Sequence, residues 1–175
     1  MYADDHLGHR GHADHVRADL PQEPIFRTRL QVRSAHRHED ALEIRPSGSA
    51  ASRRAPADYF TGAVWQDPIV EAPAPGNVRA SVVRFESGAR TAWHTHPAGQ
   101  TLYILSGVGR VQSLGGPIRE VRAGDVVWFP PNEKHWHGAG PQTTMSHVAI
   151  TEVRDGKFVE WMEKVTDQQY QAAAG

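Results

Sequence analysis

The sequence lacks three features that would each point to a particular class of protein. It has no cysteine, which excludes disulfide scaffolds, thiolate metal sites and cysteine nucleophiles. No apolar run approaches the roughly 18–20 residues that a membrane span needs, so we predict no membrane partner. Nineteen basic residues stand against 20 acidic ones, and the net charge of -1 gives no electrostatic argument for a nucleic-acid partner. The opening residues lack the apolar segment of a signal peptide, and we therefore expect a cytoplasmic protein.

Histidine, by contrast, is abundant and unevenly distributed. The first forty residues contain one Phe, one Tyr and no Trp, and they alternate charged residues, His, Gly and Pro without a sustained apolar period. Such a segment cannot bury enough apolar surface to offset its ordering entropy. We predict a disordered tail over residues 1–41 and one folded domain over 42–175. The tail holds six of the 11 histidines (His6, His9, His12, His15, His36, His38). The first four are spaced by three and could bind a metal on one face of a helix. Two glycines lie among them and disfavour a helix, so a tail without function is the better interpretation.

The remainder of the chain has the pattern of an all-β domain. Short alternating runs recur every 8–12 residues or so and are separated by Gly and Pro, which is typical of an antiparallel sandwich or barrel. The turn signal Asp155-Gly156 predicts a hairpin between Thr144–Val153 and Phe158–Val165. A capping box begins one short C-terminal helix over Asp167–Ala174. The other predicted strands are Val78–Phe85, Thr91–His96, Thr101–Leu105, Gly109–Leu114, Ile118–Val121 and Val126–Phe129.

Two histidines in one of these runs suggest a metal site. His94 and His96 stand two residues apart, so both imidazoles project from the same face of a strand. Gln100 follows after a Pro-Ala-Gly turn and can reach back toward them, and His135 comes later, after another strand. Four neutral ligands that converge inside a barrel suit a divalent first-row metal. Taken alone, the His-x-His pair could equally be two hydrogen-bonded strand histidines.

The spacing of these residues resembles the two motifs of the cupin superfamily. Gly88-Ala-Arg-Thr-Ala-Trp-His-Thr-His-Pro-Ala-Gly-Gln100, closed by Gly107, is similar to the first motif, G-x5-H-x-H-x3,4-E-x6-G. Gly124-Asp-Val-Val-Trp-Phe-Pro-Pro-Asn-Glu-Lys-His135 is similar to the second, G-x5-P-x-G-x2-H-x3-N. The resemblance implies a single antiparallel jelly-roll barrel that forms a homo-oligomer. Gln100 replaces the acidic ligand of the first motif, while Asn132 and Ala139 replace a glycine and an asparagine of the second; Asn132 still tolerates a left-handed backbone.

From about Ala57 to Tyr170 the chain resembles a narrower group, the manganese-dependent bacterial hydroxynitrile lyases of the (R)-mandelonitrile lyase type. The segments Arg90-Thr-Ala-Trp-His-Thr-His-Pro and Lys134-His-Trp-His-Gly carry this resemblance, as does glutamine in the ligand position. It implies that Mn²⁺, or else Fe²⁺, Ni²⁺ or Zn²⁺, binds four residues and that a small-molecule substrate binds beside them. The resemblance implies that His94, His96, Gln100 and His135 are metal ligands. It implies that His147 is the catalytic histidine and that His137 is a further histidine of the pocket. Thr151 occupies a substrate-pocket position where the group commonly has Gln.

The glutamine ligand also has a direct electrostatic interpretation. Three imidazoles and one amide carry no charge, so a bound divalent ion keeps its full +2 and stabilises anions such as alkoxide or cyanide. This favours a lyase that cleaves and forms cyanohydrins of aromatic aldehydes, with the metal as Lewis acid and His147 as general base. Without the resemblance, His147 would be interpreted as a buried histidine bonded to a backbone carbonyl. An Fe(II) dioxygenase and a non-catalytic metal- or small-molecule-binding cupin remain as alternatives.

Overall fold

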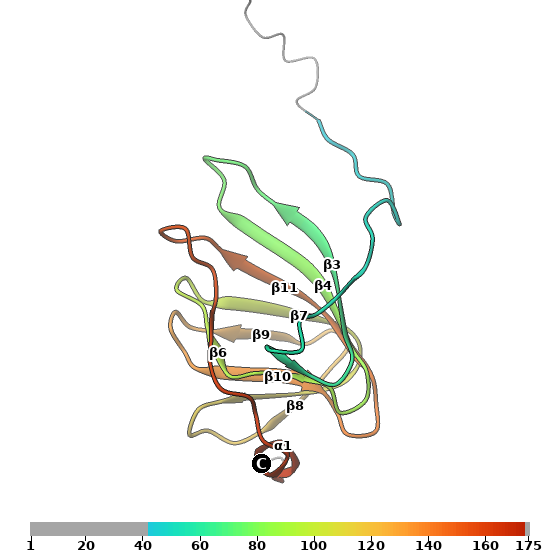
Figure 1. The fold of residues 1–175 in the computed structure, drawn as a ribbon, viewed down its shortest axis with the longest axis vertical. Helices are drawn as coiled ribbons and strands as arrows, with labels where there is room; N and C mark the ends of the chain where they lie inside the picture. Colours follow the sequence, from blue (N-terminus) through green and yellow to red (C-terminus); the bar gives the residue numbers. More distant parts are fainter. Residues whose placement is uncertain (1–41, 174–175) are drawn as a thin grey trace, which may run out of the picture. The chain divides into compact units, whose positions relative to one another are not determined.

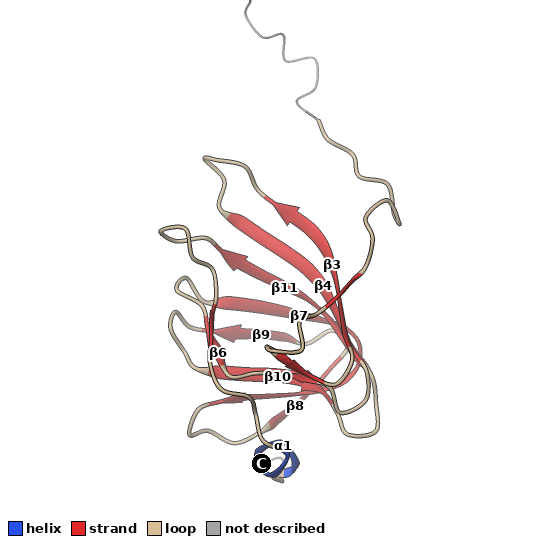
Figure 2. Ribbon diagram, viewed as in Figure 1, coloured by secondary structure: helices blue, strands red, loops and turns tan. Residues whose placement is uncertain are grey.

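The structure, a computed structural model, describes residues 42–173, and the predictions for the N-terminal tail lie outside these residues. Strands make up most of the ordered structure, and a single short helix follows them near the C-terminus of the described part (Figure 2). The elements in chain order are β1 (Arg53–Arg54), β2 (Phe60–Thr61), β3 (Val64–Glu71), β4 (Val78–Phe85), β5 (Arg90–Thr91), β6 (His94–Thr95), β7 (Gln100–Ser113), β8 (Arg119–Arg122), β9 (Val126–Phe129), β10 (His135–Ala139), β11 (Met145–Glu152), β12 (Glu160–Trp161) and α1 (Asp167–Gln171).

The strands form a curled antiparallel sheet, which confirms the predicted fold class. Hydrogen bonding runs in the order β1-β3-β4-β11-β7-β10-β5-β2, with β8 and β9 paired to β7, and β6 linking β10 to β12. Figure 1 shows β3, β4, β11 and β7 arranged side by side, with β10 and β8 continuing below them. The main buried apolar cluster contains residues from both halves of this sheet, including Phe85 and Leu102 from one half and Val111 from the other.

Strand β7 joins the two halves of the sheet. The sequence predicts two strands here, separated at Ser106-Gly107, but the structure has one continuous strand whose first half pairs with β11 and whose second half pairs with β10. Gly107 lies between the halves with φ of 74°. A Cβ at this position would lie 1.9 Å from the carbonyl oxygen of Thr144, so only glycine fits. The glycine therefore bends the strand and does not end it.

The predicted hairpin after β11 is wrong beyond its turn. Asp155 and Gly156 do adopt positive φ, and one bridge joins Arg154 to Lys157. The chain then leaves β11, and β12 pairs with β6, where Trp161 lies opposite His94. Apolar packing accounts for this course, because the Trp161 ring stacks on Tyr59 with centroids 4.9 Å apart.

Other elements differ from the prediction in their bounds. Strand β3 was not predicted, because Pro68 interrupts its pattern; the structure accommodates the proline with a register shift before Val70. The predicted run Thr91–His96 contains two short strands, β5 and β6. The capping box is confirmed, with Thr166 as N-cap, but the helix ends at Gln171. Within residues 42–173 no helix is long and apolar enough to cross a membrane.

A second buried cluster attaches the C-terminal helix to the barrel. The Tyr170 hydroxyl donates a 2.7 Å hydrogen bond to the Ala139 carbonyl oxygen. The buried Arg90 guanidinium donates to the Val165 carbonyl oxygen and to the Asp167 carboxylate at the first turn of the helix. These contacts secure the C-terminal end against β5 and β10, the strands that also carry or border the histidines.

Candidate metal centre and cavity

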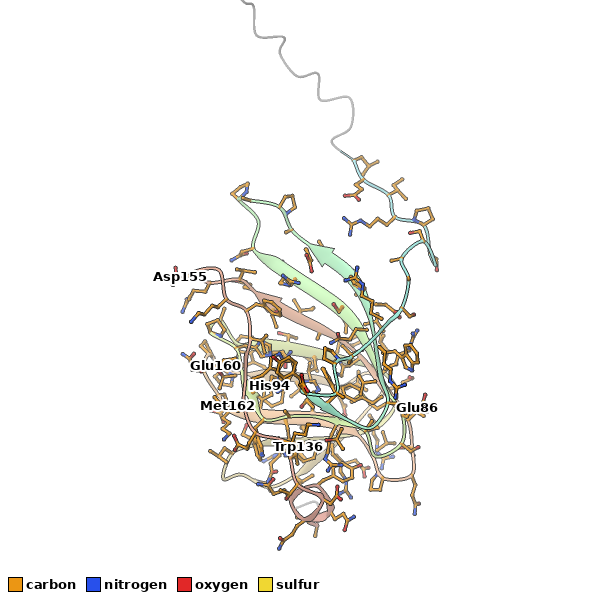
Figure 3. All side chains as sticks on the ribbon, viewed as in Figure 1. Glu86, His94, Trp136, Asp155, Glu160 and Met162 are labelled. Carbon is orange, nitrogen blue, oxygen red and sulfur yellow. The ribbon has the colours of Figure 1, made fainter. Side chains whose placement is uncertain are left out.

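Short antiparallel pairings bring the four predicted ligands together. His135 begins β10 and lies directly opposite His94 on β6, and opposite residues of an antiparallel pair present their side chains to the same face. His96 follows β6 immediately, and Gln100 begins β7 after the turn. All four side chains are buried. Figure 3 shows His94 in the interior of the strand assembly, beside the segment that carries Glu160 and Met162.

Backbone carbonyl groups orient the three imidazole rings. Nδ1 of His94 and Nδ1 of His135 each face the carbonyl oxygen two residues earlier in the chain, at 2.9 and 2.7 Å. Nδ1 of His96 faces the carbonyl oxygen of Phe158 at 2.5 Å. Because a carbonyl oxygen only accepts, Nδ1 must carry the proton in each ring, and Nε2 is left with its lone pair. This is the arrangement of a metal-ligating histidine and its supporting carbonyl.

The amide oxygen of Gln100 faces one of these Nε2 atoms. Oε1 of Gln100 lies 3.0 Å from Nε2 of His135. A lone pair on each side makes this a contact between two acceptors, and a cation between them would make it favourable. Adjacent ligands at about 2.1 Å from a metal would be about 3.0 Å apart at right angles. The donor set therefore fits a divalent cation.

The histidines are uncharged at neutral pH because burial opposes protonation. Burial lowers the pKa of His135 to about 3, despite the opposing effect of its backbone hydrogen bond. Burial lowers the pKa of His94 well below its usual value, and the nearby rings of His135 and His96 lower it further. Burial is also the largest cause of the lowered pKa of His96. Metal binding therefore requires no prior loss of protons in the folded protein.

Beside this cluster lies a second pair of histidines. Nε2 of His147, on β11, lies 3.2 Å from Nδ1 of His137, on β10. Within residues 42–173 the outer nitrogens of the pair, His147 Nδ1 and His137 Nε2, have no hydrogen-bond partner. Burial lowers the pKa of His147 to about 3 and that of His137 well below its usual value, and the nearby His147 lowers the pKa of His137 further. The pair is therefore neutral and contains an unprotonated nitrogen.

His137 also lies close enough to the first cluster to compete as a ligand. Ligand atoms of His94, His135 and His137 all lie within 4.8 Å of one another. This three-histidine set overlaps the predicted one and has His137 in place of His96. Only in the set with His96 does each Nδ1 face a backbone carbonyl.

Both histidine clusters open onto one cavity of about 210 Å³. This is larger than the cavity of about 150 Å³ that holds a benzene ring in an apolar core. Thr151 lines it, together with His147 from the same strand. Trp161 also lines it; the pairing of β12 with β6, which places Trp161 there, leaves no local signal in the sequence. Further lining residues that the sequence did not reveal include Arg53, Phe60, Gln66, Arg79, Phe158 and Val159.

Comparison with known proteins agrees with this architecture. A family model described as a cupin domain matches residues 81–150, which include all four candidate ligands and His147. A curated (R)-mandelonitrile lyase from Granulicella tundricola is 58% identical over 129 residues, covering 74% of this chain and 98% of the relative. The chain is a cupin. The similarity to a curated lyase supports a lyase-like function for this cupin.

Solved structures show the same fold. A cupin-like protein from Thermotoga maritima is 39% identical, with a TM-score of 0.66, over 75% of this cupin and 97% of that chain. A polyketide cyclase from Streptomyces resistomycificus is 14% identical, with a TM-score of 0.59, over 74% of this cupin and 91% of that chain. The second likeness shows only that the fold is shared. The left-handed φ of 63° at Asn132 agrees with the expectation for this altered position of the second cupin motif.

Proposed function

We propose that this cupin is a metal-dependent lyase that cleaves and forms cyanohydrins of aromatic aldehydes. One observation carries the proposal: a neutral donor set suited to a divalent cation and a neutral histidine pair open onto the same cavity. The similarity to a curated (R)-mandelonitrile lyase supports this choice of reaction. In the proposal His94, His96, Gln100 and His135 hold the metal.

Mn²⁺ is the metal that we propose, with Fe²⁺, Ni²⁺ and Zn²⁺ as alternatives. Bound by uncharged ligands, it would supply a site of net +2 charge that favours an anionic oxygen on the substrate. We assign the third imidazole ligand to His96 and not to His137, because the Nδ1 atom of His137 faces His147 and, among residues 42–173, no carbonyl group orients the His137 ring for a metal. His137 is then free to act with His147.

The histidine pair can accept the hydroxyl proton of a cyanohydrin. Two neutral rings carry two protons on four nitrogens; one proton lies in the contact between the rings, so one of the two outer nitrogens is unprotonated. In cleavage we assign acceptance of the proton to His147 as general base, with His137 sharing the charge through the 3.2 Å contact. The bond between the carbinol carbon and the nitrile breaks, its electron pair leaves with cyanide, and the carbinol becomes the aldehyde carbonyl. The reverse sequence adds cyanide to an aldehyde.

Metal analysis of the purified protein, followed by a mandelonitrile cleavage assay with that metal, tests the proposal. We expect His147→Ala to retain the metal and to lose cleavage by about 10²–10⁴-fold, the usual contribution of a general base. Ser146→Ala is the matched control, because its hydroxyl bonds Ser106 and its side chain does not line the cavity. Unchanged cleavage in His147→Ala with metal bound would refute the catalytic assignment.

The same preparations separate the other two functions. Iron-dependent oxygen uptake without cyanohydrin cleavage would indicate a dioxygenase. Metal binding without turnover of either kind would indicate a binding module. Activity of the Mn²⁺-loaded protein in the absence of oxygen supports the lyase.

A homo-oligomer also belongs to this proposal. The outward face of the sheet carries Val126 (67% exposed) and Trp128 (56% exposed) on β9. Their register neighbours on β7 and β11 include Tyr103 and Ile150, which are also exposed. Large apolar side chains in adjacent strands are typical of a surface covered by another subunit. We expect Trp128→Arg to lower the mass measured by light scattering to that of the monomer; an unchanged mass would exclude this face as the interface.

A further inference from the structure

The exposed end of the cavity has a different chemical character from its buried end. The buried end consists of the two histidine clusters, while the charged residues that line the cavity are Arg53, Glu71 and Arg79. Two cations and one anion leave a net charge of +1 on these side chains. A metal held by neutral ligands would add its own charge to the same cavity.

Arg79 is already engaged within the protein. Its guanidinium contacts the Glu71 carboxylate, which is the only acidic side chain among the residues that line the cavity. The same guanidinium lies 4.1 Å from the centre of the Phe158 ring, a cation–π distance. Arg79 and Glu71 therefore neutralise each other and hold one side of the opening in place.

Arg53 is not engaged in this way. It lies on β1 directly opposite Gln66 of β3, and because both line the cavity, the register places its side chain on the inner face. Its neighbour Arg54 lies opposite Trp65 and so belongs to the other face. Within residues 42–173 no acidic side chain forms an ion pair with Arg53. Its guanidinium is therefore available to a ligand.

Between the two ends the walls are largely apolar. Val83 and Ala149 line the cavity from β4 and β11, and Phe60 and Trp161 line it from the other half of the sheet. These side chains would contact an apolar or aromatic part of a ligand. From its buried to its exposed end, the cavity therefore has a reactive polar part, an apolar part and a cationic part.

We propose that the cavity takes substrates with a carboxylate or similar anionic group, which Arg53 binds while the hydroxyl or carbonyl group reacts at the histidines. This rests on the proposed function, because the histidine end is taken as the reacting end. A guanidinium presents paired N–H donors that match the two oxygens of a carboxylate. The substrate class is thus an anionic aromatic hydroxy or oxo compound.

Two probes of equal shape test the charge alone. Calorimetry with the Mn²⁺-loaded full-length protein would compare 4-formylbenzoate, which carries a carboxylate, with 4-formylbenzamide, which is neutral. The variants are Arg53→Gln and, as matched control, Arg54→Gln, which removes the same charge from the outer face of the same strand. Circular dichroism and thermal unfolding would establish that both variants fold as the wild type does.

We expect the wild type and Arg54→Gln to bind 4-formylbenzoate about tenfold more tightly than the amide, equivalent to about 1.4 kcal/mol. Arg53→Gln should bind the two probes equally. Equal binding in the wild type, or a preference that survives in Arg53→Gln, would overturn the proposal; the latter would place the carboxylate on the metal or on Arg79. Since binding needs no turnover, absence of mandelonitrile cleavage would refute the proposed function and leave this result standing.

Discussion

Acidification of the metal-free protein should destabilise it well above the pH at which carboxylates titrate. The five histidines of the cavity are all buried, and burial lowers the pKa of each. In the unfolded chain a histidine titrates near pH 6.5. Below that pH the unfolded state binds more protons than the folded state, so the free energy of unfolding falls as the pH falls. The loss begins near pH 6.5 and levels off near pH 3, where His135 and His147 become protonated in the folded state.

The structure gives the size of this effect for two of the groups. His135 and His147 are each 0% exposed, and each has a pKa of about 3. Between pH 7.5 and 5.5 a shift from about 6.5 to about 3 costs roughly 1.4 kcal/mol per group, or about 3 kcal/mol for the two. The other three histidines act in the same direction. The loss is a large part of the 5–15 kcal/mol that is typical of folded domains.

Urea denaturation at pH 7.5 and 5.5, in the presence of a chelator, measures this difference. The variant His147→Gln removes one titrating group, and we expect it to reduce the difference by about 1.4 kcal/mol. Bound metal should raise the free energy of unfolding at both pH values alike, since the folded ligands are deprotonated at both. An equal free energy of unfolding at pH 7.5 and 5.5 would refute the reasoning, as would an undiminished difference in the variant.

Three further predictions concern the metal ligands and the stability of the barrel. His96→Ala should abolish Mn²⁺ occupancy measured by elemental analysis, whereas His137→Ala should retain it; the reverse result would assign the third imidazole ligand to His137. Gly107→Ala should destabilise the protein by at least about 3 kcal/mol in urea unfolding, because a methyl group there overlaps a carbonyl oxygen. Gly88→Ala, also at positive φ but with open space around its Cβ position, should cost only about 1 kcal/mol, and equal losses would contradict the steric argument. Tyr170→Phe should lower the free energy of unfolding by about 1–3 kcal/mol by leaving a buried carbonyl oxygen unbonded, and no loss would show that this hydrogen bond is dispensable.

Local sequence was sufficient where the physical cause is local. Short runs bounded by Gly and Pro identified β4, β9 and β11, and in β4 the alternation follows because side chains of a strand alternate between its faces. The capping box at Thr166 identified the start of the helix, since both of its hydrogen bonds join residues three positions apart. The same local reasoning failed for β3, whose proline is tolerated only because the pairing with β4 shifts register there. Local reasoning also predicted that a strand ends near Gly107, although β7 only bends there and pairs with a partner strand on each side of the bend.

The sequence by itself determined the type of protein and the chemistry available to it. Without cysteine, and with Gln100 in place of an acidic ligand, any metal held by the predicted residues has only neutral donors, since charge is a property of residue type. The tertiary structure decided how those donors are used. The carbonyl of Phe158, 62 residues from His96, orients that ring. The register of β1 on β3 turns Arg53 inward and Arg54 outward. Both outcomes depend on pairings between distant segments, and no spacing along the chain contains them.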